Sequence, residues 1–255
     1  MTLHHRVEGE GDRVLVLSGS LGSTLEMWGP QVDSLSQEFL VVRYDHPGHG
    51  CSPLPARGGR ADDFADGVLQ LLEQLGVDRF SFCGLSLGGA VGMTLALRAG
   101  RRLERLVLCC TAAKIATPEF WAERAATVRG AGVESIADTV VGRWFTSEYA
   151  AAEPETVQRY RAMLVATPPE GYAHCCEVLG AFDLRDRLRS IEVPTLVIAG
   201  DEDPVVSLEE AAELERGIRR CRLAVLSPAA HLANVERRDA FNREVLAHLT
   251  AEVAA

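Results

Sequence analysis

The residue with the clearest chemical potential is a serine between two glycines, in segment 84–88 (GLSLG). The apolar residues 80–83 before it predict a buried strand, and the small and apolar residues 89–97 after it are compatible with a helix. Glycines on both sides remove Cβ atoms that would clash where a strand reverses into a helix, and the turn lifts the serine hydroxyl clear of the sheet. Ser86 is therefore a candidate nucleophile.

A serine hydroxyl is a weak nucleophile at neutral pH, so it needs a base, and the base needs a carboxylate to orient it. Of the seven histidines, only His231 follows a predicted strand end in a loop that could present it to Ser86. The others lie near the N-terminus, in a glycine-rich loop, in an insertion and in the last predicted helix: His4, His5, His46, His49, His174 and His248. His231 is the candidate base.

The orienting acid is expected just past the carboxyl end of a strand. A strand predicted over 195–199 is followed by three acids, and we favour the third, Asp203, because Pro204 restricts its backbone and makes the loop more rigid. Asp201 and Glu202 are more typical of solvated loop acids.

Attack on a carbonyl by serine also requires two backbone N–H groups aimed at the developing negative charge. One is expected from Leu87, immediately after the nucleophile. The other is expected from the glycine-containing turn 18–22 (SGSLG), which follows the first clear strand. Within this turn we favour Ser20, with Leu21 as the alternative, because the sequence does not determine which amide points inward.

The elements that position these residues alternate along the chain. Continuous apolarity predicts strands covered on both faces, as in a parallel sheet. Such strands are predicted at 14–17, 39–42, 80–83, 106–109, 195–198 and 223–226, and helices at 61–75, 87–99, 208–216 and 239–249. The alternation predicts an α/β fold with a mostly parallel, doubly wound sheet flanked by helices.

This alternation breaks over 117–189, where helical patterning occurs without a convincing strand and where two of the three tryptophans, Trp121 and Trp144, lie. We predict a helical cap over the sheet end at which sites of α/β proteins sit. The core would then consist of two parts, 1–116 and 190–255.

Composition restricts the class of protein. With 255 residues, 47% hydrophobic and 24% charged, the chain is typical of a folded globular protein. Its net charge of −10 disfavours nucleic acid and anionic membranes as partners, and an anionic substrate would need local basic residues. The longest uncharged stretch, 81–97, contains four glycines and divides into strand, turn and helix, which argues against a membrane span.

The cysteines and the N-terminus indicate the compartment. Seven cysteines form an odd set without a C-x-x-C motif, so free thiols in a reducing cytoplasm are predicted in preference to disulfides or a zinc site. Residues 4–10 are polar where a signal peptide would need an apolar core. We therefore expect a cytoplasmic protein.

Over its whole length the chain resembles the α/β-hydrolase superfamily, whose catalytic residues follow the chain order serine, acid, histidine. Ser86, Asp203 and His231 follow the same order. Within it, the chain closely resembles the 3-oxoadipate enol-lactonases of aromatic-acid catabolism. The specific resemblance lies in 106–115 (LVLCCTAAKI), 143–146 (RWFT), 170–172 (EGY) with Cys176 following, and 230–236 (AHLANVE). The chain departs from the family after Pro204, where Val206 and Ser207 replace the usual Thr-Pro.

The resemblance implies hydrolysis of 3-oxoadipate enol-lactone to 3-oxoadipate, without metal or cofactor. Such a small anionic lactone carries an acetate arm, for which a local cation is expected. Arg124 shares a face of a predicted helix with Trp121, and Arg143 adjoins Trp144. A guanidinium can hold a carboxylate with two hydrogen bonds and an indole can shield the ring, so these four are the candidate substrate-binding residues, with Lys114 next.

Two alternatives remain open, and a third class of enzyme is disfavoured. A carboxylesterase or another lactonase would use the same triad with a different pocket. A ligand receptor built on this fold could retain the triad and turn over slowly. Dehalogenases and epoxide hydrolases of similar fold are disfavoured, because they carry aspartate where Ser86 stands. The oligomeric state is left open.

Overall fold

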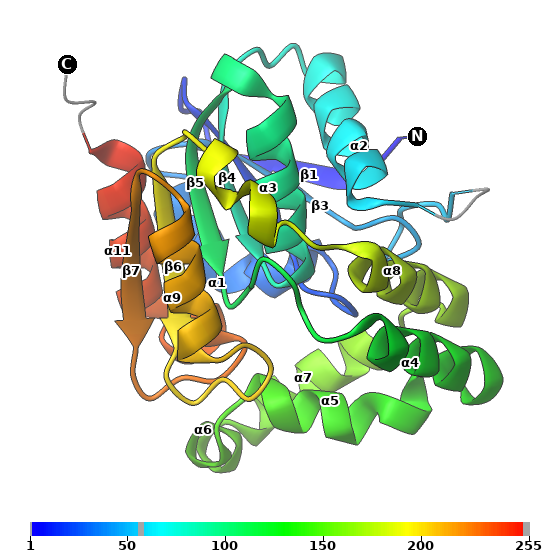
Figure 1. The fold of residues 1–255 in the computed structure, drawn as a ribbon. Helices are drawn as coiled ribbons and strands as arrows, with labels where there is room; N and C mark the ends of the chain where they lie inside the picture. Colours follow the sequence, from blue (N-terminus) through cyan, green and yellow to red (C-terminus); the bar gives the residue numbers. More distant parts are fainter. Residues whose placement is uncertain (1, 56–58, 252–255) are drawn as a thin grey trace.

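The computed structural model describes residues 2–55 and 59–251. Their seven strands form one sheet in the order β1-β3-β2-β4-β5-β6-β7, in which only β1 pairs antiparallel to its neighbour (Figure 1). The strands are β1 (His5–Glu8), β2 (Val14–Ser18), β3 (Leu40–Tyr44), β4 (Phe80–Leu85), β5 (Leu103–Cys109), β6 (Thr195–Gly200) and β7 (Cys221–Leu226). The predicted α/β fold with a mostly parallel sheet is confirmed.

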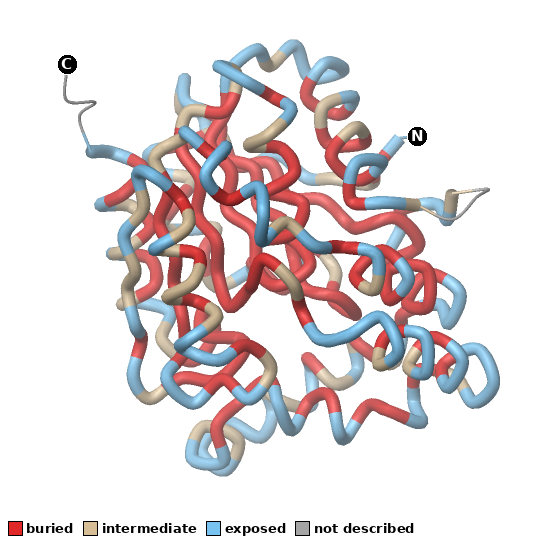
Figure 2. The backbone as a smooth tube through the Cα atoms, in the orientation of Figure 1, coloured by how far each residue is buried: buried red, intermediate tan, exposed pale blue. Residues whose placement is uncertain are grey.

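Helices cover both faces of this sheet. On one side α2 packs against α3, and α3 packs against β4 and β5; on the other, α11 packs against α1 and against β5 to β7. These helices and the others of the core are α1 (Gly29–Leu35), α2 (Ala61–Gln74), α3 (Leu87–Arg98), α9 (Leu208–Gly217), α10 (Ala233–Glu236) and α11 (Arg238–Thr250). Every residue of β2, β4 and β6 is buried as a result, and Figure 2 shows the core as a continuous buried layer.

Five helices between β5 and β6 lie beyond the tips of the strand arrows in Figure 1. They are α4 (Pro118–Ala131), α5 (Ala137–Trp144), α6 (Ser147–Ala152), α7 (Pro154–Val165) and α8 (Pro169–Ala181), which we call the cap segment. Within it α4 packs on α8 and α5 on α7. The helices begin where the pattern predicted; the division into core and cap domains stays a prediction. Among the described residues, no helix is both long and apolar enough to traverse a bilayer.

At one point the cap segment contacts the core through backbone atoms, without side chains between them. Gly171 of α8 lies against Gly48 in the loop after β3, and a Cβ atom on either residue would overlap the other's backbone. No side chain fits between the helix and the loop at this point.

The two edges of the sheet differ from the sequence prediction. β1 was missed because three of its four residues are polar and all four are exposed or only partly buried, so no apolar pattern marks it. The expectation that the predicted strands are covered on both faces is wrong for β7, where Val225 is 46% exposed. β7 is the last strand of the order and, among the described strands, has a neighbour on one side only.

Buried histidines make the stability of the fold dependent on pH. Burial lowers the pKa of His46 and of His248 to about 4, and that of His49 to about 3. In the unfolded chain these histidines have the ordinary pKa of about 6.5, whereas in the folded chain their pKa is lower. Between the two pKa values the unfolded chain therefore binds more protons than the folded chain does. The free energy of unfolding should therefore decrease as pH falls from about 6.5 to about 4.

His248→Gln tests this expectation without touching the cavity described below. Removing one of these titrating imidazoles should reduce the pH dependence of the free energy of unfolding near pH 5 by up to about 1.4 kcal/mol per pH unit. Urea denaturation of both proteins at several pH values measures the slope. Identical slopes would contradict the expectation.

Candidate active site

Ser86 lies on the sharp turn between β4 and α3. Its φ of 57° and ψ of −111° form a backbone conformation that residues other than glycine rarely adopt. A Cβ atom on Gly84 would overlap the Gly88 carbonyl, and one on Gly88 would overlap the Ser18 carbonyl. Both glycines are thus required for the close approach of β2, β4 and α3 that presents the serine at the ends of the strands.

His231 and Asp203 form a buried hydrogen-bonded pair. Nδ1 of His231 lies 2.9 Å from Oδ2 of Asp203, and both side chains are almost fully buried. The other oxygen, Oδ1, accepts the N–H groups of Val205 at 2.8 Å and Val206 at 3.2 Å, which holds the carboxylate in place. Because a carboxylate oxygen only accepts, Nδ1 carries the proton, which leaves Nε2 as the basic nitrogen of a neutral imidazole.

The competing acid is placed differently. Oδ1 of Asp201 accepts the N–H group of Ala229 at 3.1 Å, and this residue is exposed. Its contact shapes the loop that carries His231 without reaching the imidazole. The geometry therefore supports the choice of Asp203.

A cavity of about 240 Å³ lies between the ends of the strands and the cap segment, and Ser86 and His231 both line it. The cap segment contributes all four of the predicted substrate-binding residues: Trp121, Arg124, Arg143 and Trp144. A larger groove of about 490 Å³ opens elsewhere, beside α11, and includes neither the serine nor the histidine. We therefore take the smaller cavity as the candidate active site.

The two arginines are available to an anion. Nη1 of Arg124 lies 3.4 Å from the Tyr172 hydroxyl, and its guanidinium lies over the ring of Phe120. Within the described residues neither Arg124 nor Arg143 forms an ion pair, whereas Lys114 lies 3.5 Å from Asp183 and does not line the cavity. Lys114 is thus the weaker of the cationic candidates.

Trp121 is fixed in the wall of the cavity. Its indole N–H donates to the carbonyl of Ile115 at 2.6 Å, and the side chain is buried. This bond satisfies the one polar atom of the indole and leaves its ring to form an apolar surface.

The turn expected to supply an oxyanion-binding N–H group is held by two buried histidines. The carbonyl of Gly19 accepts from Nε2 of His46 at 2.8 Å, and Gly22 donates its N–H to Nε2 of His49 at 3.0 Å. Both Ser20 and Leu21 line the cavity, so the choice between them stays open. Leu87 is the first residue of α3, where a helix N-terminus leaves N–H groups free of intrahelical partners.

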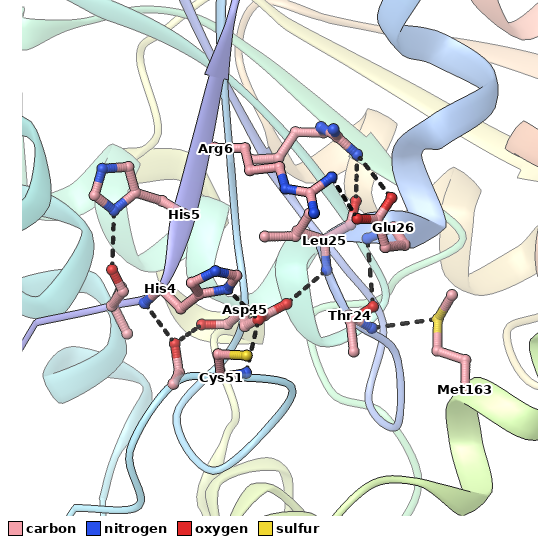
Figure 3. A network of polar contacts seen from close by, with 12 residues as sticks. His4, His5, Arg6, Thr24, Leu25, Glu26, Asp45, Cys51 and Met163 are labelled. Carbon is pink, nitrogen blue, oxygen red and sulfur yellow. Dashed lines mark hydrogen bonds and ion pairs between the residues drawn. The ribbon is translucent and has the colours of Figure 1, made fainter.

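Asp45 in turn holds the loop that carries these histidines, and Figure 3 shows its polar contacts. Its Oδ1 accepts from the N–H of Leu25 at 2.7 Å, and its Oδ2 accepts from that of Cys51 at 3.0 Å. Asp45, Cys51 and His4 also place one ligand atom each within 4.8 Å of one another. Oδ2 already lies 2.7 Å from Nδ1 of His4, a hydrogen-bond distance that satisfies the pair without an ion.

Sequence reasoning missed part of the cavity wall. The further lining residues are Ile115, Ala116, Phe120, Val140, Tyr172, Pro204 and Val205. Ile115 and Tyr172 belong to the segments that carry the enol-lactonase resemblance, which was the available signal. His46 and His49 were set aside as competing bases, although a glycine-rich loop with two histidines could have indicated a scaffold for the neighbouring turn.

Comparison with known proteins identifies the family. Residues 12–237 match the family model of the alpha/beta hydrolase fold. The chain belongs to the α/β-hydrolase family. It is 38% identical to 3-oxoadipate enol-lactonase 2 of Acinetobacter baylyi over 96% of this chain and 92% of that relative.

Solved structures of similar enzymes have the same fold as this chain. The enol-lactonase from Burkholderia xenovorans LB400 superposes with a TM-score of 0.95 at 43% identity, covering 98% of this chain and 96% of that one. A thermophilic esterase from Thermogutta terrifontis superposes with a TM-score of 0.92 at 27% identity, covering 97% and 92%. The close similarity to enol-lactonases supports an ester-hydrolysing enzyme with a hydrolase or lactonase role.

Proposed function

We propose that this α/β-hydrolase opens 3-oxoadipate enol-lactone to 3-oxoadipate with a Ser86–His231–Asp203 triad. The observation that carries the proposal is the buried His231–Asp203 hydrogen bond behind a cavity that Ser86 and His231 both line. Two arginines on the same wall have no acidic partner among the described residues, and they suit a substrate that carries a carboxylate. Similarity to enol-lactonases over nearly the whole chain, cap segment included, supports this substrate.

In the proposed reaction, Nε2 of His231 takes the proton of the Ser86 hydroxyl as Oγ attacks the lactone carbonyl. The oxyanion that forms is stabilised by the N–H groups of Leu87 and of Ser20 or Leu21. Collapse breaks the ring C–O bond and expels an enolate, which receives the proton from the imidazolium and becomes the ketone. Water, deprotonated by His231, then attacks the acyl group, releases the new carboxylate and restores the Ser86 hydroxyl. The chemistry uses no metal or cofactor.

Steady-state turnover of a substrate panel tests the proposal. The enol-lactone should be hydrolysed in many turnovers and with a higher kcat/KM than simple esters or other lactones. The similarity to an esterase favours carboxylesterase as the second candidate, and an esterase would rank a simple ester first. A single turnover at most, with tight binding, would instead indicate a ligand receptor.

Replacing Arg124 or Arg143 with alanine identifies the residue that holds the acetate arm of the lactone. Loss of a charge-assisted, two-point contact should raise KM for the anionic lactone by ~10-fold or more, because such bonds contribute about 1.5–3 kcal/mol. A neutral ester of similar size should show little change. Equal losses on both substrates would mean that the arginine is structural, and unchanged kinetics in both variants would remove these residues from the substrate site.

A further inference from the structure

Glu236 is a buried acid to which the proposed reaction assigns no role. It is the last residue of α10 and lies five positions after His231. The residue is only 9% exposed. Within the described residues it forms no ion pair with arginine, lysine or histidine, so its carboxylate depends on hydrogen bonds for its burial.

The two oxygens of Glu236 hold two separate parts of the molecule. Oε1 accepts both the N–H and the hydroxyl of Thr146, each at 2.8 Å. Oε2 accepts the N–H of Ala230 at 2.5 Å. Thr146 belongs to the cap segment, just after the cavity residues Arg143 and Trp144, whereas Ala230 immediately precedes His231 in the core.

A backbone bond joins the same two parts beside this carboxylate. The N–H of Leu232 donates to the carbonyl of Trp144 at 2.9 Å. The residues before and after His231 are therefore both tied to the stretch 144–146, one through Glu236 and one directly. His231 and Trp144 line the same cavity, so these bonds set the separation between its core side and its cap side.

Only a carboxylate satisfies this arrangement. Three donors converge on Glu236, and a carboxylate offers acceptors on both oxygens. A glutamine of the same size would present its NH₂ group either to the backbone N–H of Thr146 or to that of Ala230, so in either orientation a donor would face a donor.

We propose that Glu236 is a positioning residue that fixes the His231 loop against the Trp144 wall of the cavity. The proposal rests on the proposed role of His231 as the base, but not on the identity of the substrate. It concerns any ester that the triad cleaves.

Glu236→Gln is the test, with Glu215→Gln as the matched control. Oε1 of Glu215 accepts a single backbone N–H, that of Leu223, at 2.9 Å near the sheet edge, and a glutamine can still accept this bond. Wild type and both variants are assayed with the enol-lactone and with p-nitrophenyl acetate, and their thermal unfolding is recorded. A third readout is the low-field NMR resonance of the His231 Nδ1 proton that Asp203 accepts.

Glu236→Gln should lower kcat/KM by up to ~10²-fold, the effect of a small displacement of a reacting group. For the lactone, which contacts the cap side, KM should rise as kcat falls; for p-nitrophenyl acetate, kcat should carry most of the loss. The His231 resonance should shift or broaden. Glu215→Gln should match wild type in all of these measurements.

A lower melting temperature with unchanged kinetics and an unchanged His231 resonance would overturn the proposal, because Glu236 would then only stabilise the fold. If Glu236→Gln does not fold, Thr146→Val removes the hydroxyl that donates to Glu236, together with the acceptor that this hydroxyl provides to the Tyr149 N–H at the start of α6. This variant should raise KM for the lactone, and an unchanged KM would overturn the proposal. If the lactone is not a substrate, p-nitrophenyl acetate decides. If neither ester is cleaved, the proposed function fails, and the His231 resonance alone decides the role of Glu236.

Discussion

Replacing Ser86 with alanine is expected to reduce kcat by ~10⁶-fold, the effect of deleting the nucleophile of a serine triad. Without Oγ no acyl-enzyme can form, and the cavity retains only weak hydrolysis from its oxyanion-binding groups. The backbone conformation, with a φ of 57°, costs alanine about as much as serine, so the melting temperature should change little. Pre-steady-state and steady-state hydrolysis of the lactone measures the loss.

The residual activity of Ser86→Ala decides whether Ser86 is the nucleophile. A preparation free of contaminating hydrolase that retains more than a tenth of wild-type kcat would falsify the assignment of Ser86. Mass spectrometry after treatment with a fluorophosphonate provides a second check, because the label should be found on Ser86 in the wild type and be absent from the variant.

The second large effect is expected from Asp203→Asn, which should lower kcat by ~10⁴-fold. The amide can present its NH₂ group to Nδ1, which favours the tautomer with the proton on Nε2, where it blocks acceptance of the serine proton. The imidazolium would also lose its counter-charge. KM should change much less, because Asp203 lies behind the imidazole and does not line the cavity.

Asp201→Asn is the matched control for this experiment. It changes an acid two residues away whose carboxylate contacts the N–H of Ala229 and not the imidazole. Its kcat should remain within a few fold of wild type. The reverse ranking of the two variants would move the orienting role to Asp201.

Much of the fold could be predicted because its signals are local. The central strands β2, β4 and β6 are mostly apolar, since they are covered on both faces. The elbow around Ser86 needs glycine on either side of it. Asp203 could be chosen over Asp201 because Pro204 follows it. β1 carried no such signal: His5–Glu8 is a polar edge strand whose place depends on pairing with β3.

The parts of the site that could not be predicted depend on contacts between distant segments. His46 and His49 lie about 27 residues from the turn that they hold, so their glycine-rich loop could suggest a scaffold but could not identify the residues it contacts. Glu236 contacts Thr146 across 90 residues. Arg124 and Arg143 could be named from their neighbouring tryptophans, but only the folded chain shows that both line one cavity and have no acidic partner among the described residues.

The meeting of Gly48 and Gly171 has a consequence for how such a protein can be altered. Because their backbones touch, a library that varies either position should yield almost no folded clones, whatever happens elsewhere in the chain. Val140 and Ile115 are different, since each presents an apolar side chain to the cavity and a smaller or larger one changes its shape. Substrate preference should therefore change through residues that line the cavity, on the core side as well as in the cap segment, while the two glycines stay constant.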